Sequence, residues 1–204
     1  MKVKINTHPK HYLEIGNVFF TSDLHINHES VIKFGRKFSN VEEMNDTIYT
    51  NINNKVGKDD LLVLLGDTMM IDKNYNKFLS LINCENVIML YGNHDNPKRF
   101  EEIDGYPANK LLYHGYYLEL SINKQIICCS HYPMFHWNYQ SDGSFMLHGH
   151  THGDEPSNIL KEIHKYKSLD VGIDNYYNIF GTYDVFSLNQ IQELLNSNLI
   201  VNRH

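Results

Sequence analysis

The sequence predicts an α/β fold, and two observations support this prediction. In the first half of the 204-residue chain, short apolar runs alternate with amphipathic helical patterns. The order β, α, β, α, β, α implies parallel strands joined by right-handed crossovers. In the second half, two strand-like runs flank an Asn-Lys turn, which indicates an antiparallel hairpin. The chain therefore combines parallel and antiparallel strand pairing.

Composition favours one domain over residues 1–204. The chain is 42% hydrophobic and contains no stretch rich in Pro, Gly or Ser that would link two domains. A net charge of −6 argues against tight binding to duplex nucleic acid, which requires a basic surface. The 3 cysteines suit core thiols in a reducing compartment better than a disulfide framework. The sequence has no apolar leader and no run of membrane-spanning length, so we expect a cytoplasmic protein with no membrane partner.

The first elements lead to a polar motif. Residues 1–17 are poorly patterned and contain at most one early strand. Residues 18–22 form a clear β run that is followed directly by Asp23-Leu24-His25. A helix is expected from about Glu29 to Phe38. The next helix is predicted to begin at a capping box formed by Ser39 and Glu42.

This second helix has the strongest periodicity in the chain. Apolar residues recur every four positions, at Met44, Ile48, Ile52 and Val56. Gly57 then ends the pattern.

Two further strands end in polar residues. Residues 61–65 form a buried apolar run that leads into Gly66-Asp67. An amphipathic helix is expected over 75–82, before a strand over 87–90 that leads into Gly92-Asn93-His94-Asp95. Asn96 followed by proline resembles an N-cap that opens a short helix, ending near Ile103.

The second half supplies the remaining motifs. The hairpin comprises residues 116–122 and 126–130 and ends at His131. A polar and aromatic loop, about 132–143, leads to an apolar run and then to His148-Gly149-His150-Thr151-His152. Later strands are expected over 169–173 and 185–188, and a final helix over 191–199.

Five strand ends carry groups that bind metals. These groups are Asp23, His25, Asp67, Asn93, His94, His131, His150 and His152. Residues two apart in a strand face the same way, so Asp23 with His25, and His150 with His152, could each point at a shared ion. Imidazoles and carboxylates without thiolates suit Mn, Fe, Zn or Ni. These candidate ligands are more than one tetrahedral ion can bind, and they suit two ions that share a bridging carboxylate.

Most of the motifs, taken alone, have an ordinary structural explanation, whereas Gly149-His150-Thr151-His152 is suggestive by itself. Asp23-x-His25 could be a solvated loop, Gly66-Asp67 a turn, and Asp95 or Asn96 a helix cap. Such groups at five separate strand ends are an improbable coincidence, so the set predicts a functional site.

The ordered motifs resemble those of the calcineurin-like metallophosphoesterases. Asp23-x-His25, Gly66-Asp67, Gly92-Asn93-His94-Asp95, Ser130-His131 and Gly149-His150-Thr151-His152 occur in that family's order, over residues 18–153. The resemblance implies a four-layer α/β/β/α sandwich of two mixed sheets flanked by helices. It also implies two divalent metal ions, for which we expect Mn first, with Fe, Zn or Ni as alternatives.

The resemblance also implies which residues bind each ion and how the reaction proceeds. One ion would take Asp23, His25, Asp67 and His152, and the other Asp67, Asn93, His131 and His150. A water between the ions would lose a proton and attack the phosphate. His94 matches a non-ligand histidine of the family, which stabilises or protonates the leaving oxygen.

Departures from the family pattern narrow the range of expected substrates. The protein phosphatase branch has a second aspartate after Gly-Asp that orients its catalytic histidine, and Met70 stands at this position here. Phosphoprotein hydrolysis is therefore not expected, and the residue that orients His94 is left open. The compact length and the segment from Asp23 to His28, with Arg36 downstream, instead resemble small bacterial and phage phosphodiesterases.

Four residues outside the motifs are candidates for substrate binding. His28 and Arg36 could bind the substrate phosphate, or could belong to a surface helix face. Tyr132 and Trp137 could stack on a base or ribose, or could brace their loop in an aromatic cluster.

We therefore predict a phosphodiesterase that acts on a small nucleotide or nucleic-acid-derived ester. A phosphomonoesterase is the alternative within enzymes. A metal-stabilised binding module without catalysis is the alternative from another class, but it predicts missing ligands and none is missing. The sequence does not determine the oligomeric state.

Overall fold

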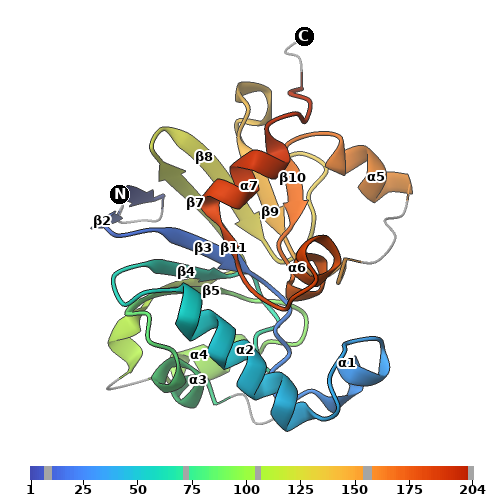
Figure 1. Cartoon of the computed structure of the whole chain (residues 1–204). Helices are drawn as coiled ribbons and strands as arrows, with labels where there is room; N and C mark the ends of the chain where they lie inside the picture. The colour runs from blue at the N-terminus through green and yellow to red at the C-terminus, as the bar shows by residue number, and fades with distance from the viewer. Residues whose placement is uncertain (7–10, 71–73, 104–106, 154–157, 202–204) are drawn as a thin grey trace.

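Two β-sheets stack face to face, and helices cover their outer faces (Figure 1). The computed structural model describes residues 1–6, 11–70, 74–103, 107–153 and 158–201. Both sheets contain parallel and antiparallel pairs. The α/β/β/α arrangement of two mixed sheets flanked by helices, implied by the sequence motifs, is confirmed.

The first sheet has five strands in the order β11-β3-β4-β5-β6. Its strands are β3 (Val18–Thr21), β4 (Leu61–Leu64), β5 (Asn86–Leu90), β6 (Leu111–Gly115) and β11 (Phe186–Ser187). The strands from β3 to β6 run parallel, as the alternation of strands and helices predicted. The sequence analysis missed β6, because this edge strand is only half-buried and lacks an apolar run.

The second sheet has six strands in the order β10-β9-β8-β7-β1-β2. Its strands are β1 (Lys2–Ile5), β2 (His11–Glu14), β7 (Tyr117–Ile122), β8 (Gln125–Ser130), β9 (Phe145–His148) and β10 (Ser168–Asp170). The predicted hairpin is β7 with β8, and Ile122 pairs with Gln125 across its turn. The expectation of at most one early strand was wrong, since β1 and β2 pair with each other at the sheet edge.

Alternate residues of each central strand face different cores. Val18 and Phe20 of β3 point into the core between the two sheets, whereas Phe19 points outward. Helix α7 (Leu188–Leu195) adds Leu188 and Ile191 to the inner core.

The outer helices complete the layers. Helices α2 (Val41–Lys55), α3 (Tyr75–Leu81) and α4 (Pro97–Glu101) cover the five-stranded sheet. Helix α5 (Asn158–His164) packs on the six-stranded sheet through Ile163. Among the helices of the described residues, none has the length and apolar character needed to cross a bilayer.

The cap of α2 lies one residue later than predicted. Asn40, not Ser39, is the N-cap, and its side chain accepts a hydrogen bond from Glu43 N at 2.8 Å. The Glu43 carboxylate in turn accepts from Ser39 N at 2.7 Å, so Glu42 takes no part in this box. Asn is as good an N-cap as Ser, and the sequence alone did not separate the two registers.

Other boundaries also shift. The predicted helix over 29–38 is α1 (Glu29–Lys33), because Gly35 adopts φ 136° and stops it. The strand expected over 169–173 ends at Asp170, and Ile173 begins helix α6 (Ile173–Phe180), which the sequence analysis missed together with α5.

The end of the chain changes in a similar way. The strand expected over 185–188 is only two residues long, because Ser187 forms a capping box with Gln190. Helix α7 therefore starts at Leu188 and ends at Leu195, before the expected limit of 199.

Candidate metal centre

The candidate ligands lie on loops that follow strands of both sheets. Asp23 and His25 follow β3, Asp67 follows β4, and Asn93 follows β5. The ligands from the second sheet are His131 after β8 and His150 and His152 after β9. The two sheets thus contribute to one site, in which two groups of side chains can be distinguished.

Asp23, His25 and His152 form the first group. Asp23 Oδ1 lies 4.0 Å from His25 Nε2 and 3.7 Å from His152 Nε2. The two imidazole nitrogens are 3.3 Å apart. These three ligand atoms all lie within 4.8 Å of one another, which is close enough for one ion to contact all of them.

Asp67, Asn93 and His131 form the second group. His131 Nε2 lies 3.4 Å from Asp67 Oδ2 and 3.0 Å from Asn93 Oδ1. The ring of His150 lies edge-on to that of His131, with centroids 5.1 Å apart. Asp67 Oδ2 is also 3.9 Å from His25 Nε2, so a single carboxylate oxygen faces both groups.

The ligand loops have an unusual backbone. Positive φ values between 50° and 70° occur at Asp23, His25, Asp67, His150 and His152, in a region that non-glycine residues rarely occupy. Strained backbone of this kind concentrates at functional sites. These turns, and not the alternation of strand residues, direct the side chains, because β3 ends at Thr21 and β9 at His148.

The same turns separate two histidines that we expected to share an ion. His152 faces Asp23 and His25, whereas His150 faces His131 and Tyr132. The strand-alternation reasoning was therefore wrong for His150 and His152, although both lie at the site.

Two motif glycines allow the loops to approach closely. A Cβ atom on Gly92 would overlap the Asp67 carboxylate, and one on Gly149 would overlap Ser22 and Asp23. Any side chain at either position would push a candidate ligand out of place.

Hydrogen bonds orient the imidazoles of two candidate ligands. His131 Nδ1 donates to Leu65 O at 2.9 Å, so Nε2 is left to accept a cation. His25 Nδ1 lies 3.2 Å from His28 Nδ1, which likewise leaves Nε2 on the side of Asp23.

Asp95 joins the loop that carries Asp67 to the loop that carries Asn93 through hydrogen bonds. Its Oδ2 accepts from Asp67 N at 2.7 Å and from Gly92 N at 2.8 Å, and its Oδ1 accepts from Tyr75 Oη at 2.6 Å. Asn96, not Asp95, caps α4.

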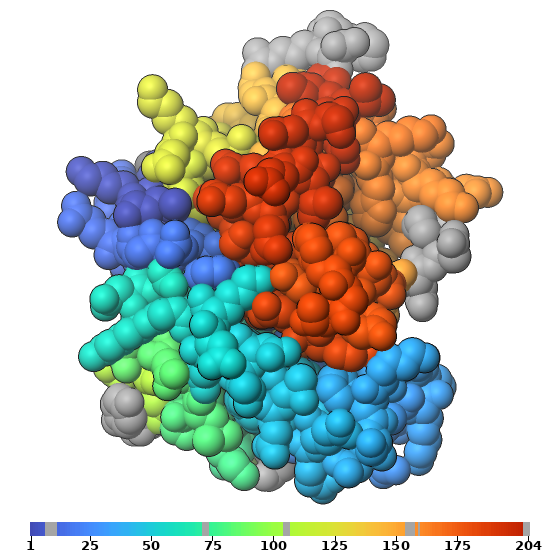
Figure 2. All heavy atoms as spheres, viewed as in Figure 1, coloured from blue at the N-terminus to red at the C-terminus, as the bar shows by residue number. Residues whose placement is uncertain are grey.

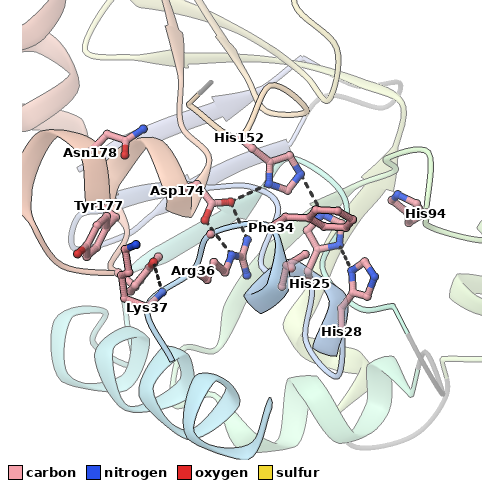
Figure 3. Close-up of a pocket in the computed structure, with 13 residues that line it drawn as sticks. His25, His28, Phe34, Arg36, Lys37, His94, His152, Asp174, Tyr177 and Asn178 are labelled. Atoms are coloured by element: carbon pink, nitrogen blue, oxygen red, sulfur yellow. Dashed lines mark hydrogen bonds and ion pairs between the residues drawn. The ribbon is translucent and has the colours of Figure 1, made fainter. Parts of the chain in front are cut away.

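Asp174 is a candidate functional residue that sequence reasoning missed. Its Oδ2 accepts a hydrogen bond from His152 Nδ1 at 2.7 Å, and Arg36 pairs with the same carboxylate (Figure 3). Asp174 lies in the first turn of α6, which the sequence analysis did not identify. An available signal was Gly172 followed by Asp174 at the end of a predicted strand, which partly repeats the pattern of the other motifs.

His94 lies beside the first group of ligands. Its backbone N–H donates to Asp67 Oδ1 at 2.8 Å, so the residue is held next to the carboxylate that faces both groups. Its ring lies edge-on to that of His25, with centroids 5.4 Å apart. The Asp67 contact orients the backbone of His94. Met70 stands where the protein phosphatase branch has the aspartate that orients its catalytic histidine.

Burial sets the charge state of this site. It raises the pKa of Asp23 to about 6, although the nearby imidazoles of His152 and His131 oppose the change. Burial, followed by the charge of Arg36, lowers the pKa of His25 to about 2 and keeps its imidazole neutral. Asp23 Oδ1 has no hydrogen-bond donor among the described residues. Burial opposes the change at His152, but the hydrogen bond to Asp174 and the nearby carboxylates raise the pKa of this imidazole. A buried carboxylate oxygen beside the neutral imidazole of His25 fits a divalent cation.

The four predicted substrate-binding residues have different environments. His28 lines the cavity beside the site, and the Tyr132 ring lies 4.6 Å from that of His150. The guanidinium of Arg36 is buried and pairs with Asp174. Trp137 is only 8% exposed, and its indole N–H donates to Ser144. The placement of Trp137 favours the alternative in which it braces its loop.

Comparisons with known proteins identify relatives along most of the chain. A model of the family described as calcineurin-like phosphoesterase matches residues 16–198. The uncharacterized protein MJ1445 of Methanocaldococcus jannaschii is 31% identical over 195 residues, which cover 93% of this chain and 97% of that protein. The Gene 66 protein of Mycobacterium phage L5 is 27% identical, with 88% and 97% covered.

A solved structure resembles the fold. The protein of unknown function AQ665 from Aquifex aeolicus matches with a TM-score of 0.65 at 21% identity, and the match covers 88% of this chain and 99% of that one. At this identity the likeness supports the fold alone.

Proposed function

The chain belongs to the calcineurin-like phosphoesterase family, and from this premise we propose that it is a two-metal phosphodiesterase acting on a nucleotide-derived ester. Membership implies metal-dependent hydrolysis of a phosphate ester. The ester type, the number of ions and the roles of individual residues are parts of the proposal.

The position of Asp67 is the observation that carries the proposal. Its Oδ2 lies 3.9 Å from His25 Nε2 and 3.4 Å from His131 Nε2, so it faces ligands from both groups. A shared carboxylate oxygen is what a pair of neighbouring ions requires.

The donor set suggests how the ions would be held. Asp23, His25, Asp67 and His152 would hold one ion, and Asp67, Asn93, His131 and His150 the other. The absence of thiolates favours Mn, with Fe, Zn or Ni as alternatives. Bound divalent ions would supply Lewis acidity and lower the pKa of water near the phosphate.

The residues of the chain would then perform three tasks. Asp67 and Asp23 would hold the ions in place, and the Asp67 contact with the backbone of His94 would keep that histidine beside the phosphate. The His94 side chain, which lines the same cavity as His25 and His152, would donate a proton to the leaving oxygen.

Charge favours a diester over a monoester. A monoester carries about one more negative charge than a diester near neutral pH. The cavity wall contains the cations of Arg36 and Lys37, but the Arg36 guanidinium is already paired with Asp174. Apart from the proposed ions, Arg36 therefore offers no unpaired charge to the second negative charge of a monoester, and this favours the diester.

A small phosphate ester is the proposed partner, and the cytoplasm is the proposed location. The thiols of Cys84, Cys128 and Cys129 are buried and unpaired with one another, which supports a reducing compartment.

The test compares hydrolysis of bis-p-nitrophenyl phosphate with that of p-nitrophenyl phosphate in the presence of Mn²⁺. We expect the diester to be the better substrate and Asp67→Asn to abolish both activities. A strong preference for the monoester would replace the proposal with a phosphomonoesterase. If Asp67→Asn retained both activities, the bridging role of Asp67 would be refuted.

A further inference from the structure

A cavity extends from the metal centre along the surface of the protein. Its volume is about 690 Å³, and its inner end is lined by His25, His94 and His152. It continues between the segment that contains α1 and helix α6, which lie side by side on one face of the molecule (Figures 2 and 3). We call the part lined by Phe34, Lys37, Tyr177 and Asn178 the α1–α6 arm. In Figure 3, Phe34 is drawn beside His25 and His152, and the other three residues are drawn on the far side of the Arg36–Asp174 pair.

The cavity is larger than the reacting group requires. Pockets that enclose small organic ligands have volumes of about 300–1,000 Å³, and this cavity lies within that range. A phosphate group at the ligand histidines would leave the α1–α6 arm for a substituent of the ester.

Phe34 is the most unusual feature of the arm. Its side chain is 87% exposed, so packing in the protein core does not explain an aromatic ring at this position. The turn around it is nevertheless well defined, since Phe34 N donates to Ser30 O and Arg36 N donates to Val31 O. Gly35, at φ 136°, lets the chain turn so that Arg36 points inward while Phe34 stays on the surface.

The opposite wall of the arm is held in place by contacts within the fold. Tyr177 stacks on Tyr183, with ring centroids 4.4 Å apart and planes 18° apart. The amide nitrogen of Asn178 donates to Gly153 O at 3.0 Å, one residue after the candidate ligand His152.

The side chains of the arm combine three kinds of group. Phe34 offers a flat aromatic face, Asn178 an amide, and Lys37 a cation. A nucleobase needs an aromatic face for stacking and a polar group for its edge. A lipid tail could contact Phe34 and Tyr177, but it would offer no polar group to Lys37 and Asn178 on the same wall.

We propose that the α1–α6 arm binds the single nucleoside substituent of the substrate, with its base stacked on Phe34. The inference rests on the proposed phosphoesterase function, and it places the base on the side of α1 and not on the loop over 132–143. The phosphate would lie at the inner end of the cavity, between the metal centre and His28.

Binding tests the arm without requiring turnover. Calorimetry on the Mn²⁺-loaded full-length protein compares thymidine 5′-phosphate with methyl phosphate, which have the same charged group. We expect the nucleotide to bind roughly tenfold more tightly, since stacking of one base accounts for a difference of this size. Phe34→Ala should remove this preference, and Phe34→Trp should restore it.

Phe135→Ala is the matched control. Phe135 is also an exposed aromatic residue, at 57%, but it lies on the loop over 132–143 and does not line the cavity. We expect this variant to keep the preference for the nucleotide. Equal binding of both phosphates by the wild type, or an unchanged preference in Phe34→Ala, would overturn the proposal. Loss of the preference in Phe135→Ala alone would place the base on the other loop and would also overturn it.

Hydrolysis tests the phosphodiesterase activity separately from the binding of a base in the arm. The p-nitrophenyl esters of thymidine 5′-phosphate and of methyl phosphate release the same leaving group. We expect Phe34→Ala to raise KM for the thymidine ester with little change in kcat. If the protein hydrolysed neither ester, the proposed phosphodiesterase activity would be refuted. The binding preference measured by calorimetry would then still test whether the α1–α6 arm binds a base. Equal kcat/KM for both esters in the wild type would refute the arm alone.

Discussion

Arg36 and Asp174 form a buried two-point ion pair between segments that are distant in the sequence. Arg36 Nε lies 2.8 Å from Asp174 Oδ1, and Nη2 lies 2.8 Å from Oδ2. The same guanidinium donates to the backbone carbonyls of Asp23 and Leu24. Asp174 in turn accepts from His152 Nδ1, so one cation connects the loop of Asp23 to the loop of His152.

This pair also determines the charge of Asp174. Burial alone would raise the pKa of this carboxyl, but the hydrogen bond from His152 and the charge of Arg36 outweigh it and hold the pKa at about 2. Asp174 is therefore ionised throughout the physiological range, and its hydrogen bond keeps His152 Nε2 directed at the candidate metal centre.

Asp174→Asn should weaken metal binding. The amide can still accept from His152 but lacks the negative charge, and loss of such an outer carboxylate typically lowers metal affinity about 10–100-fold. Titration of metal-free protein with Mn²⁺ measures the effect. The matched control is Asp184→Asn, because Asp184 pairs with Lys55 and does not contact a candidate ligand. Equal Mn²⁺ affinity in the wild type and Asp174→Asn would show that the contact has no orienting role.

Arg36→Met should destabilise the fold. It would leave the Asp174 carboxylate buried without its cation, and removal of one partner of a buried pair costs about 3–5 kcal/mol. The free energy of unfolding in urea, measured without metal, gives the value. Arg99→Met is the control, because its pair with Glu102 is exposed and such pairs contribute about 0–1 kcal/mol. Similar losses in the two variants would contradict the structural role of Arg36.

His94→Ala should keep its metal ions and lose most of its rate. Its side chain is not among the candidate ligands, and general acid catalysis contributes roughly 10²–10⁴-fold. Metal content and kcat for a diester with a poor leaving group measure the two effects. Turnover at the wild-type rate would remove the proposed role, and loss of metal would assign His94 to the ligand set instead.

Stability should fall in mild acid through His164. Its Nε2 lies 2.9 Å from that of the buried His148, and burial followed by the charge of His148 lowers the pKa of His164 to about 4. Between this value and the ordinary 6.5, the unfolded chain binds more protons than the folded one. The contribution of His164 is therefore complete above pH 6.5 and is lost as the pH falls towards 4.

A substitution isolates this contribution. The free energy of unfolding is measured in urea without metal at pH 7 and at pH 5. We expect its decrease between these pH values to be smaller in His164→Gln than in the wild type, with a difference on the order of 1 kcal/mol. Parallel losses in the two proteins would show that His164 does not titrate as described.

The sequence was sufficient for the features that depend on neighbouring residues. The apolar runs of β3, β4 and β5, and the polar motif after each, are local patterns, and they predicted both the parallel sheet and the candidate ligands. Asn96 as the cap of α4 was equally local.

Features that depend on distant contacts were not accessible in the same way. Arg36 has its role because the fold brings it to Asp174, 138 positions away. Phe34 and Tyr177 line one cavity only because α1 and α6 meet. The strand β6 was missed because its pairing with β5 defines it better than its own sequence does.

The number of metal ions per chain tests the central claim most directly, namely that loops from both sheets jointly hold a pair of divalent cations. Metal-free protein is dialysed against Mn²⁺, and its metal content is measured by inductively coupled plasma mass spectrometry. We expect about two ions per chain. Asp67→Asn should contain fewer, because its carboxylate faces both groups of ligands. A wild-type protein that binds no Mn²⁺, or an Asp67→Asn variant that retains the full number of ions, would contradict the account.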